Sequence, residues 1–145
     1  MLLTFCLISF PDDPVSSSIF SKQFIVPKSA IDHMDHVNNV VYLQWVQDVA
    51  QEHWESKTNE EIRNKYVWVA LNHYIEYHHP AKENDEIRIE TWIESYKGAK
   101  SERHTKMINT TTQKIVVSAR TTWCLLHKET LRPVRINTEI STLFS

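Results

Sequence analysis

The chain changes its hydrophobic period once, near residue 66, and this change limits the folds that are open to it. Over residues 39–57, apolar side chains recur every three or four positions, which predicts one helix with a single apolar stripe. From residue 66 onward, apolar and polar residues alternate, which predicts half-buried strands. One long helix followed by consecutive strands favours an α+β fold, in which an antiparallel sheet curls around the helix.

The strands are predicted at residues 20–27, 66–79, 86–96, 100–109 and 114–127. Gly98, the only glycine of the chain, is expected at a hairpin turn. A short second helix is expected to start at Thr58, because Thr58 and Glu61 have capping-box spacing. Strict alternation places six side chains of the second strand on one side: Val67, Val69, Leu71, His73, Ile75 and Tyr77.

Length and charge narrow the classes of protein that the chain can belong to. The 145 residues favour a single domain, predicted over residues 20–145, with residues 1–19 as a tail or extra strand. A net charge of -2 argues against nucleic acid as a partner. The apolar opening is too short to span a bilayer and lacks the basic start of a signal peptide, so no membrane association is expected. With two widely separated cysteines, the cytoplasm is the predicted compartment.

A polar cluster precedes the long helix, in the stretch IDHMDHVNNVVYLQW. Asn38 or Asn39 is suited to cap the helix, and the acidic and histidine side chains could simply be solvated there. The partial positive charge at the start of a helix also allows this cluster a catalytic role. The amide groups of a helix start could stabilise an oxyanion, while Asp32 attacks a carbonyl or removes a proton from water.

This stretch resembles the D-x-x-G-H-V-N-N-x-x-Y signature of hotdog-fold thioesterases, the group of 4-hydroxybenzoyl-CoA and acyl-carrier-protein thioesterases. The resemblance extends over residues 20–140. It implies a hotdog fold in a homodimer or a dimer of dimers, with active sites between subunits. It also implies that Asp32 is the nucleophile or general base, that His36 positions substrate or water, and that an amide near Asn39 polarises the carbonyl.

Further substrate contacts are expected from both ends of the predicted fold. Asn38, Val40 and Tyr42 follow the catalytic motif. The cations Lys97, Lys100 and Arg103 flank the predicted hairpin, where they could meet CoA phosphates or an acidic carrier protein, or could lie on a solvated strand face.

Three departures from the family pattern weaken a multi-residue mechanism. Asp35 stands where many members have glycine, Met34 replaces an asparagine of the plant-type enzymes, and Pro80 falls where those enzymes have a glutamate. No metal or other cofactor is expected, since neither His33 with His36 nor the pair His78 and His79 fits a known zinc motif.

The sequence thus predicts an enzyme that hydrolyses acyl-CoA or acyl-ACP thioesters. The main alternative is a non-catalytic hotdog protein that binds acyl-CoA. A hotdog dehydratase is a third possibility, but it would need a different helix context for its catalytic pair.

Overall fold

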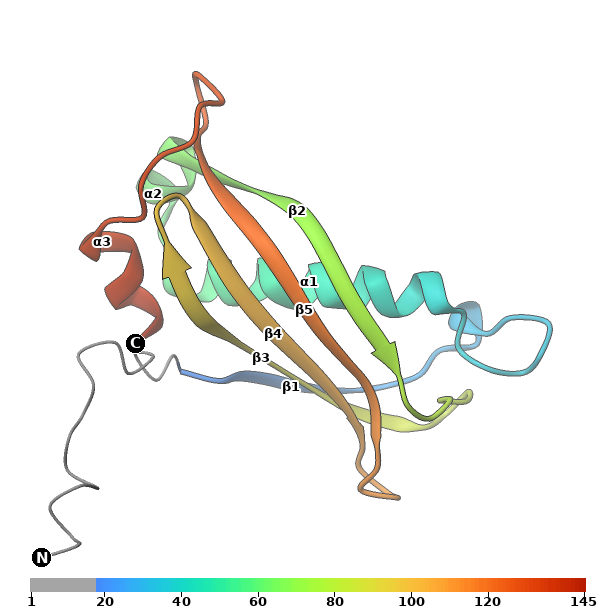
Figure 1. Cartoon of the computed structure of the whole chain (residues 1–145). Coiled ribbons are helices and arrows are strands. Elements are labelled where there is room, and N and C mark those ends of the chain that lie inside the picture. The colour runs from blue at the N-terminus through green and yellow to red at the C-terminus, as the bar shows by residue number, and fades with distance from the viewer. Residues whose placement is uncertain (1–17) are drawn as a thin grey trace, which may run out of the picture.

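The computed structural model describes residues 18–145 and contains one long helix and a five-stranded antiparallel sheet (Figure 1). The sheet has the order β1-β3-β4-β5-β2, and the helix α1 crosses one of its faces. The elements follow one another as β1 (Phe20–Ile25), η2 (Lys28–Ala30), α1 (Asn39–Lys57), α2 (Glu60–Lys65), β2 (Tyr66–Tyr77), β3 (Glu86–Lys97), β4 (Lys100–Asn109), β5 (Ile115–His127), α3 (Thr138–Ser141) and η3 (Thr142–Phe144).

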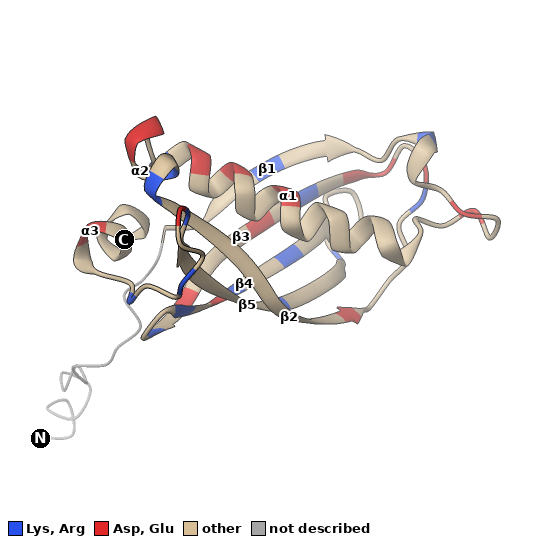
Figure 2. Cartoon of the chain, turned by 90° about the horizontal axis from the view of Figure 1, so that it is seen from above, with Lys and Arg blue, Asp and Glu red and all other residues tan. Residues whose placement is uncertain are grey.

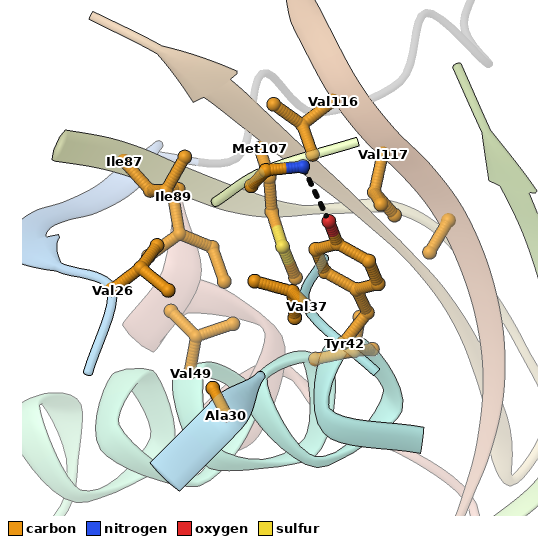
Figure 3. Close-up of a cluster of buried hydrophobic side chains, with 13 residues drawn as sticks. Val26, Ala30, Val37, Tyr42, Val49, Ile87, Ile89, Met107, Val116 and Val117 are labelled. Carbon is orange, nitrogen blue, oxygen red and sulfur yellow. Dashed lines mark hydrogen bonds between the residues drawn. The ribbon is translucent and has the colours of Figure 1, made fainter. Parts of the chain in front are cut away.

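The main core lies between α1 and the inner face of the sheet. Val46 and Val49 of α1 are fully buried, as are Ile87 and Ile89 of β3 and Met107 of β4. Figure 3 shows side chains from the helix and the strands meeting in this cluster. The predicted α+β architecture, with one helix covering the concave face of an antiparallel sheet, is confirmed.

The strict alternation predicted for the second strand is wrong, because β2 contains a bulge. Its register with β5 shifts between Ala70 and Asn72, so Leu71 is an extra residue. A bulge reverses the side on which the following residues lie. Trp68 therefore faces the helix together with Ile75, opposite Leu125 and Ala119 of β5, whereas Val67 and Val69 do not share that face.

The cap of the second helix lies one residue later than predicted. Asn59, not Thr58, caps α2, and its side-chain oxygen accepts a hydrogen bond from the Ile62 N–H at 2.9 Å. The Thr58 hydroxyl instead donates to the Trp54 carbonyl at the end of α1. Asparagine at the cap position supplies the acceptor that the capping box would have provided.

The remaining expectations about the chain ends stay predictions. Except for Ser18 and Ile19, the tail or extra strand predicted at residues 1–19 lies outside the described residues, as does Cys6. Within residues 18–145, no helix is long and apolar enough to cross a membrane. Cys124 is a free thiol, buried in β5.

Candidate active site at the start of α1

A cleft of about 450 Å³ opens where the loop before α1 meets the end of β2. The loop lies at one end of the molecule, to the right in Figure 1. Five of the predicted site residues, Asp32, His36, Asn38, Asn39 and Tyr42, line the cleft together. The other lining residues are Met34, Val37, Tyr77, His78, His79 and Pro80.

The carboxylate of Asp32 has one oxygen bound to the protein. Its Oδ1 accepts hydrogen bonds from the backbone N–H of Met34 at 2.8 Å and of His36 at 3.4 Å. No described residue donates to Oδ2. Two amide bonds to one oxygen fix the plane of the carboxylate, and the second oxygen is available to a water molecule or a carbonyl carbon.

The backbone of the same loop closes around Asp32. The Asp32 N–H donates to the His36 carbonyl at 2.8 Å, and the Asp35 N–H donates to the Asp32 carbonyl at 3.2 Å. Asp35 takes a left-handed conformation, with φ of 61°. Glycine adopts positive φ without steric cost, so this conformation would suit the glycine of the thioesterase signature equally well.

Asn38 caps α1, and this leaves one amide of the first turn open. The Asn38 side-chain oxygen accepts from the Val40 N–H at 3.0 Å, and the Asn38 carbonyl accepts from the Val41 N–H at 2.9 Å. Within residues 18–145, the Asn39 N–H has no hydrogen-bond acceptor. An unpaired amide at a helix start carries partial positive charge and suits an oxyanion.

Tyr42 joins the helix to the opposite wall of the cleft. Its hydroxyl oxygen accepts a hydrogen bond from the Ala81 N–H at 3.0 Å, shown as the dashed line in Figure 3. Tyr42 is only 3% exposed, and burial raises the pKa of its hydroxyl above 10.0. The hydroxyl is therefore neutral at physiological pH, and it acts here as a structural acceptor.

Two histidines that the sequence suggested only as metal ligands also lie in this cleft. His78 has its Nε2 2.7 Å from the Ser118 hydroxyl, and His79 has its Nδ1 3.0 Å from the Ile115 carbonyl. Because a carbonyl only accepts, His79 Nδ1 carries a proton. The topology could have suggested these residues, since β2 runs back along the sheet after α1 and ends near the start of the helix.

The other predicted substrate contacts lie elsewhere. Val40 is 72% exposed and does not line the cleft. Lys97 and Lys100 are exposed at the turn between β3 and β4, at the opposite end of the sheet from the loop before α1 (Figure 2). Arg103 does not share their surface, because strand alternation turns its side chain toward α1, where it is only 6% exposed.

Residues 17–144 match the model of one protein family, the acyl-ACP thioesterase N-terminal domain. No curated protein matches the sequence.

Solved structures share the fold at low sequence identity. The probable thioesterase YbaW of Escherichia coli superposes with a TM-score of 0.76 at 19% identity, over 85% of this chain and 94% of that chain. The 1,4-dihydroxy-2-naphthoyl-CoA thioesterase Slr0204 of Synechocystis gives 0.76 at 12% identity, over 88% and 96%. The 12:0-ACP thioesterase of Umbellularia californica gives 0.75 at 16% identity, over 88% of this chain and 51% of that chain.

Proposed function

The chain belongs to the family of acyl-ACP thioesterase N-terminal domains, a family of thioester hydrolases, and we propose that it cleaves acyl-CoA or acyl-ACP at the cleft containing Asp32. The observation that supports this site best is the arrangement of Asp32. Its Oδ1 is held by two amides, and its Oδ2 has no hydrogen-bond donor among residues 18–145, in the cleft that also contains the start of α1.

In the proposed reaction, the thioester carbonyl oxygen accepts a hydrogen bond from the Asn39 N–H. This polarises the carbonyl and stabilises the negative charge that develops on its oxygen. As a general base, Asp32 takes a proton from water while the water oxygen attacks the carbonyl carbon. As a nucleophile, its Oδ2 attacks directly, and water then hydrolyses the mixed anhydride. In both routes, the carbon–sulfur bond breaks and the thiolate leaves.

Asp32→Asn tests the site. Asparagine keeps an acceptor at the Oδ1 position but removes the charge, so the loop should persist while turnover falls by about 10²–10⁴-fold. Asp35→Asn is the matched control, because it removes the same charge from the same loop and asparagine tolerates positive φ. Thiol release from a panel of acyl-CoA and acyl-ACP thioesters measures the effect. Wild-type turnover in Asp32→Asn would remove the assignment.

The same panel distinguishes hydrolysis from the non-catalytic alternative, which would show saturable acyl-CoA binding without thiol release. Single turnover in ¹⁸O-labelled water tests the nucleophilic role of Asp32. Label found in Asp32 would show a mixed anhydride that water attacked at the aspartyl carbon, because a general base never exchanges its carboxylate oxygens.

We also propose that the chain works as a homodimer or a dimer of dimers that pairs along β2. This strand is at the edge of the sheet, is 12 residues long and carries exposed apolar side chains, including Val69, Leu71 and Tyr74. A long apolar edge strand in water invites pairing with another chain. Tyr77 at the end of β2 lines the cleft, so a partner on this edge would lie beside the active site.

The cytoplasm remains our proposed compartment. The free, buried Cys124 agrees with a reducing environment.

A further inference from the structure

The ring of Tyr42 separates the Asp32 cleft from the main core. Tyr42 lines the cleft and also belongs to the cluster of buried side chains between α1 and the sheet, which Figure 3 shows. Among residues 18–145, only Val37 shares both positions, and its side chain is much smaller. A hydrocarbon chain that passes from the cleft into the core therefore meets the Tyr42 ring.

Tyr42 lies on the inner face of α1, just beyond the amide that we propose as the oxyanion donor. Tyr42, Val46 and Val49 are buried and follow one another at helical spacing, so they share the face that α1 turns toward the sheet. Asn39 precedes Tyr42 by three residues, which corresponds to about 4.5 Å along the helix axis. An acyl chain that starts at the Asn39 N–H and runs inward along α1 reaches Tyr42 first.

Contacts on several sides hold the Tyr42 ring in place. Its hydroxyl accepts the hydrogen bond from the Ala81 N–H at 3.0 Å, on the other wall of the cleft. Trp45 packs edge-on against the ring at a centroid distance of 5.7 Å, and Trp45 in turn meets Phe24 of β1 at 4.8 Å. A swing of the ring would break these contacts and leave the buried Ala81 N–H without its acceptor, so the ring is a fixed wall.

The core behind the ring is closely packed. The fully buried members of its cluster include Val46, Val49, Ile87, Ile89 and Met107. Protein cores are packed about as densely as organic crystals, so extra methylene groups enter only if side chains move. Farther along α1, beside Ala50 and Trp54, a cavity of about 30 Å³ has room for a water molecule or two but not for a hydrocarbon chain.

We propose that the Tyr42 ring is the end wall of the acyl site and sets the longest acyl chain that the protein accepts. The cleft then takes the carbonyl and the first part of the chain, and a longer chain gains no contact with the core. Acyl groups of short and medium length, rather than long fatty acyl groups, are the substrate class that follows. This inference rests on the proposed function, because it places the acyl group in the Asp32 cleft.

Binding of uncleavable analogues tests the wall without relying on hydrolysis. In ketone analogues of acyl-CoA, a methylene group separates the sulfur from the carbonyl, so no thioester bond is present. Calorimetry on the full protein, with chains from butyl to tetradecyl, should show the affinity rising by about fourfold per added methylene and then levelling off before dodecyl. An affinity that keeps rising through tetradecyl would overturn the end wall alone. No binding at any length would contradict an acyl site in this cleft, and with it the proposed function.

Tyr42→Leu should move the limit, since leucine stays apolar but does not reach across the cleft to Ala81. The affinity should rise over about two further methylenes, so the first chains beyond the wild-type limit should bind the variant about tenfold more tightly than the wild type. Tyr42→Phe is the matched control, because phenylalanine loses the hydrogen bond but keeps the ring, and the wild-type limit should remain. An unchanged limit in Tyr42→Leu would contradict the proposal.

Tyr77→Leu distinguishes loss of the wall from a general widening of the cleft. Tyr77 also lines the cleft and contacts the Tyr42 ring at a centroid distance of 5.7 Å, but it is 48% exposed and lies outside the buried cluster. Its replacement opens the cleft toward solvent and should leave the limit unchanged. An equal shift in both leucine variants would overturn the role assigned to Tyr42. If Tyr42→Leu does not fold, Tyr42→Met takes its place, because a flexible thioether side chain can yield to an acyl chain.

Discussion

The hydroxyl of Tyr42 on α1 accepts a hydrogen bond from the backbone N–H of Ala81, 39 positions further along the chain. The bond ties the first turn of the helix to the segment that follows β2, and both ends are buried. It therefore fixes the relation between two walls of the Asp32 cleft.

Tyr42→Phe should lower the free energy of unfolding by about 1–3 kcal/mol, since it leaves the buried Ala81 N–H without an acceptor. Urea unfolding measures this change. Tyr77→Phe is the control, because the Tyr77 hydroxyl is exposed and donates to the Asn39 carbonyl over a longer 3.4 Å. An equal loss of unfolding free energy in both variants would show that the Tyr42 hydrogen bond stabilises the fold no more than the exposed Tyr77 bond does.

Asp35→Gly should leave stability within about 0.5 kcal/mol of the wild type, because relief of the left-handed backbone offsets the added freedom of the unfolded chain. Asp35→Val should cost about 1–2 kcal/mol, since a β-branched side chain clashes at positive φ. Denaturant unfolding distinguishes the two. Similar stability of the two variants would mean that the loop takes another conformation.

His36→Ala should slow thioester hydrolysis less than Asp32→Asn, because the backbone of His36, not its side chain, contacts Asp32. The side chain lines the cleft and is expected to position substrate or water. Steady-state kinetics should show a change mainly in KM. A loss of kcat as large as that of Asp32→Asn would instead place the imidazole in the proton transfer.

The stability of the chain should fall as the pH is lowered from 7 to 5, through His53. Burial, followed by the charges of Arg103 and Lys57, lowers the pKa of His53 from 6.5 to about 3. The unfolded chain therefore binds a proton in this range that the folded chain does not. The stabilisation is complete above pH 6.5 and is lost progressively below it, by about 2 kcal/mol at pH 5.

His53→Gln checks this prediction, since the glutamine oxygen can still accept from Arg103 and the side chain does not titrate. The difference between wild type and variant in unfolding free energy should change by about 2 kcal/mol between pH 7 and 5. A constant difference over that range would contradict a buried neutral His53.

Leu71→Lys should dissociate the proposed dimer. Leu71 is 50% exposed at the bulge of the edge strand, where a charge opposes pairing with another sheet. Light scattering after size-exclusion chromatography measures the mass. Leu131→Lys serves as control, since Leu131 is 63% exposed but lies outside the sheet. An unchanged dimer in Leu71→Lys would exclude pairing along the centre of β2.

Local sequence patterns predicted the helices and strands well, because hydrophobic periodicity and capping residues can be recognised within a few positions of the sequence. The long helix matches the predicted bounds, and β3, β4 and β5 match the strands predicted at residues 86–96, 100–109 and 114–127 to within one residue at each end. Asn38 is one of the two predicted caps. The bulge at Leu71 escaped prediction, since it arises from how β2 pairs with β5 and not from the residue itself.

Only the residues of the active site that lie within one continuous stretch of sequence could be predicted. The sequence grouped Asp32, His36 and Asn39, which are neighbours in the loop and the first turn. Tyr77 enters the cleft from the end of β2 and His79 from the segment just after it, and predicting this requires knowing where that strand ends in space. Arg103 looked like one of several surface cations, because sequence spacing alone does not show which face of a strand is covered by the helix.

The single extra residue in β2 divides that strand into two halves. Even-numbered residues face α1 in the first half, and odd-numbered residues face it in the second. The half before Leu71 presents Trp68 to Trp54 of α1, and the half after it presents Tyr77 to the Asp32 cleft. Deleting one residue between them would turn the side chains of one half to the opposite face of the sheet, while the half that stayed anchored would keep its contacts. A one-residue deletion in β2 can therefore preserve the inward position of Trp68 or that of Tyr77, but not both.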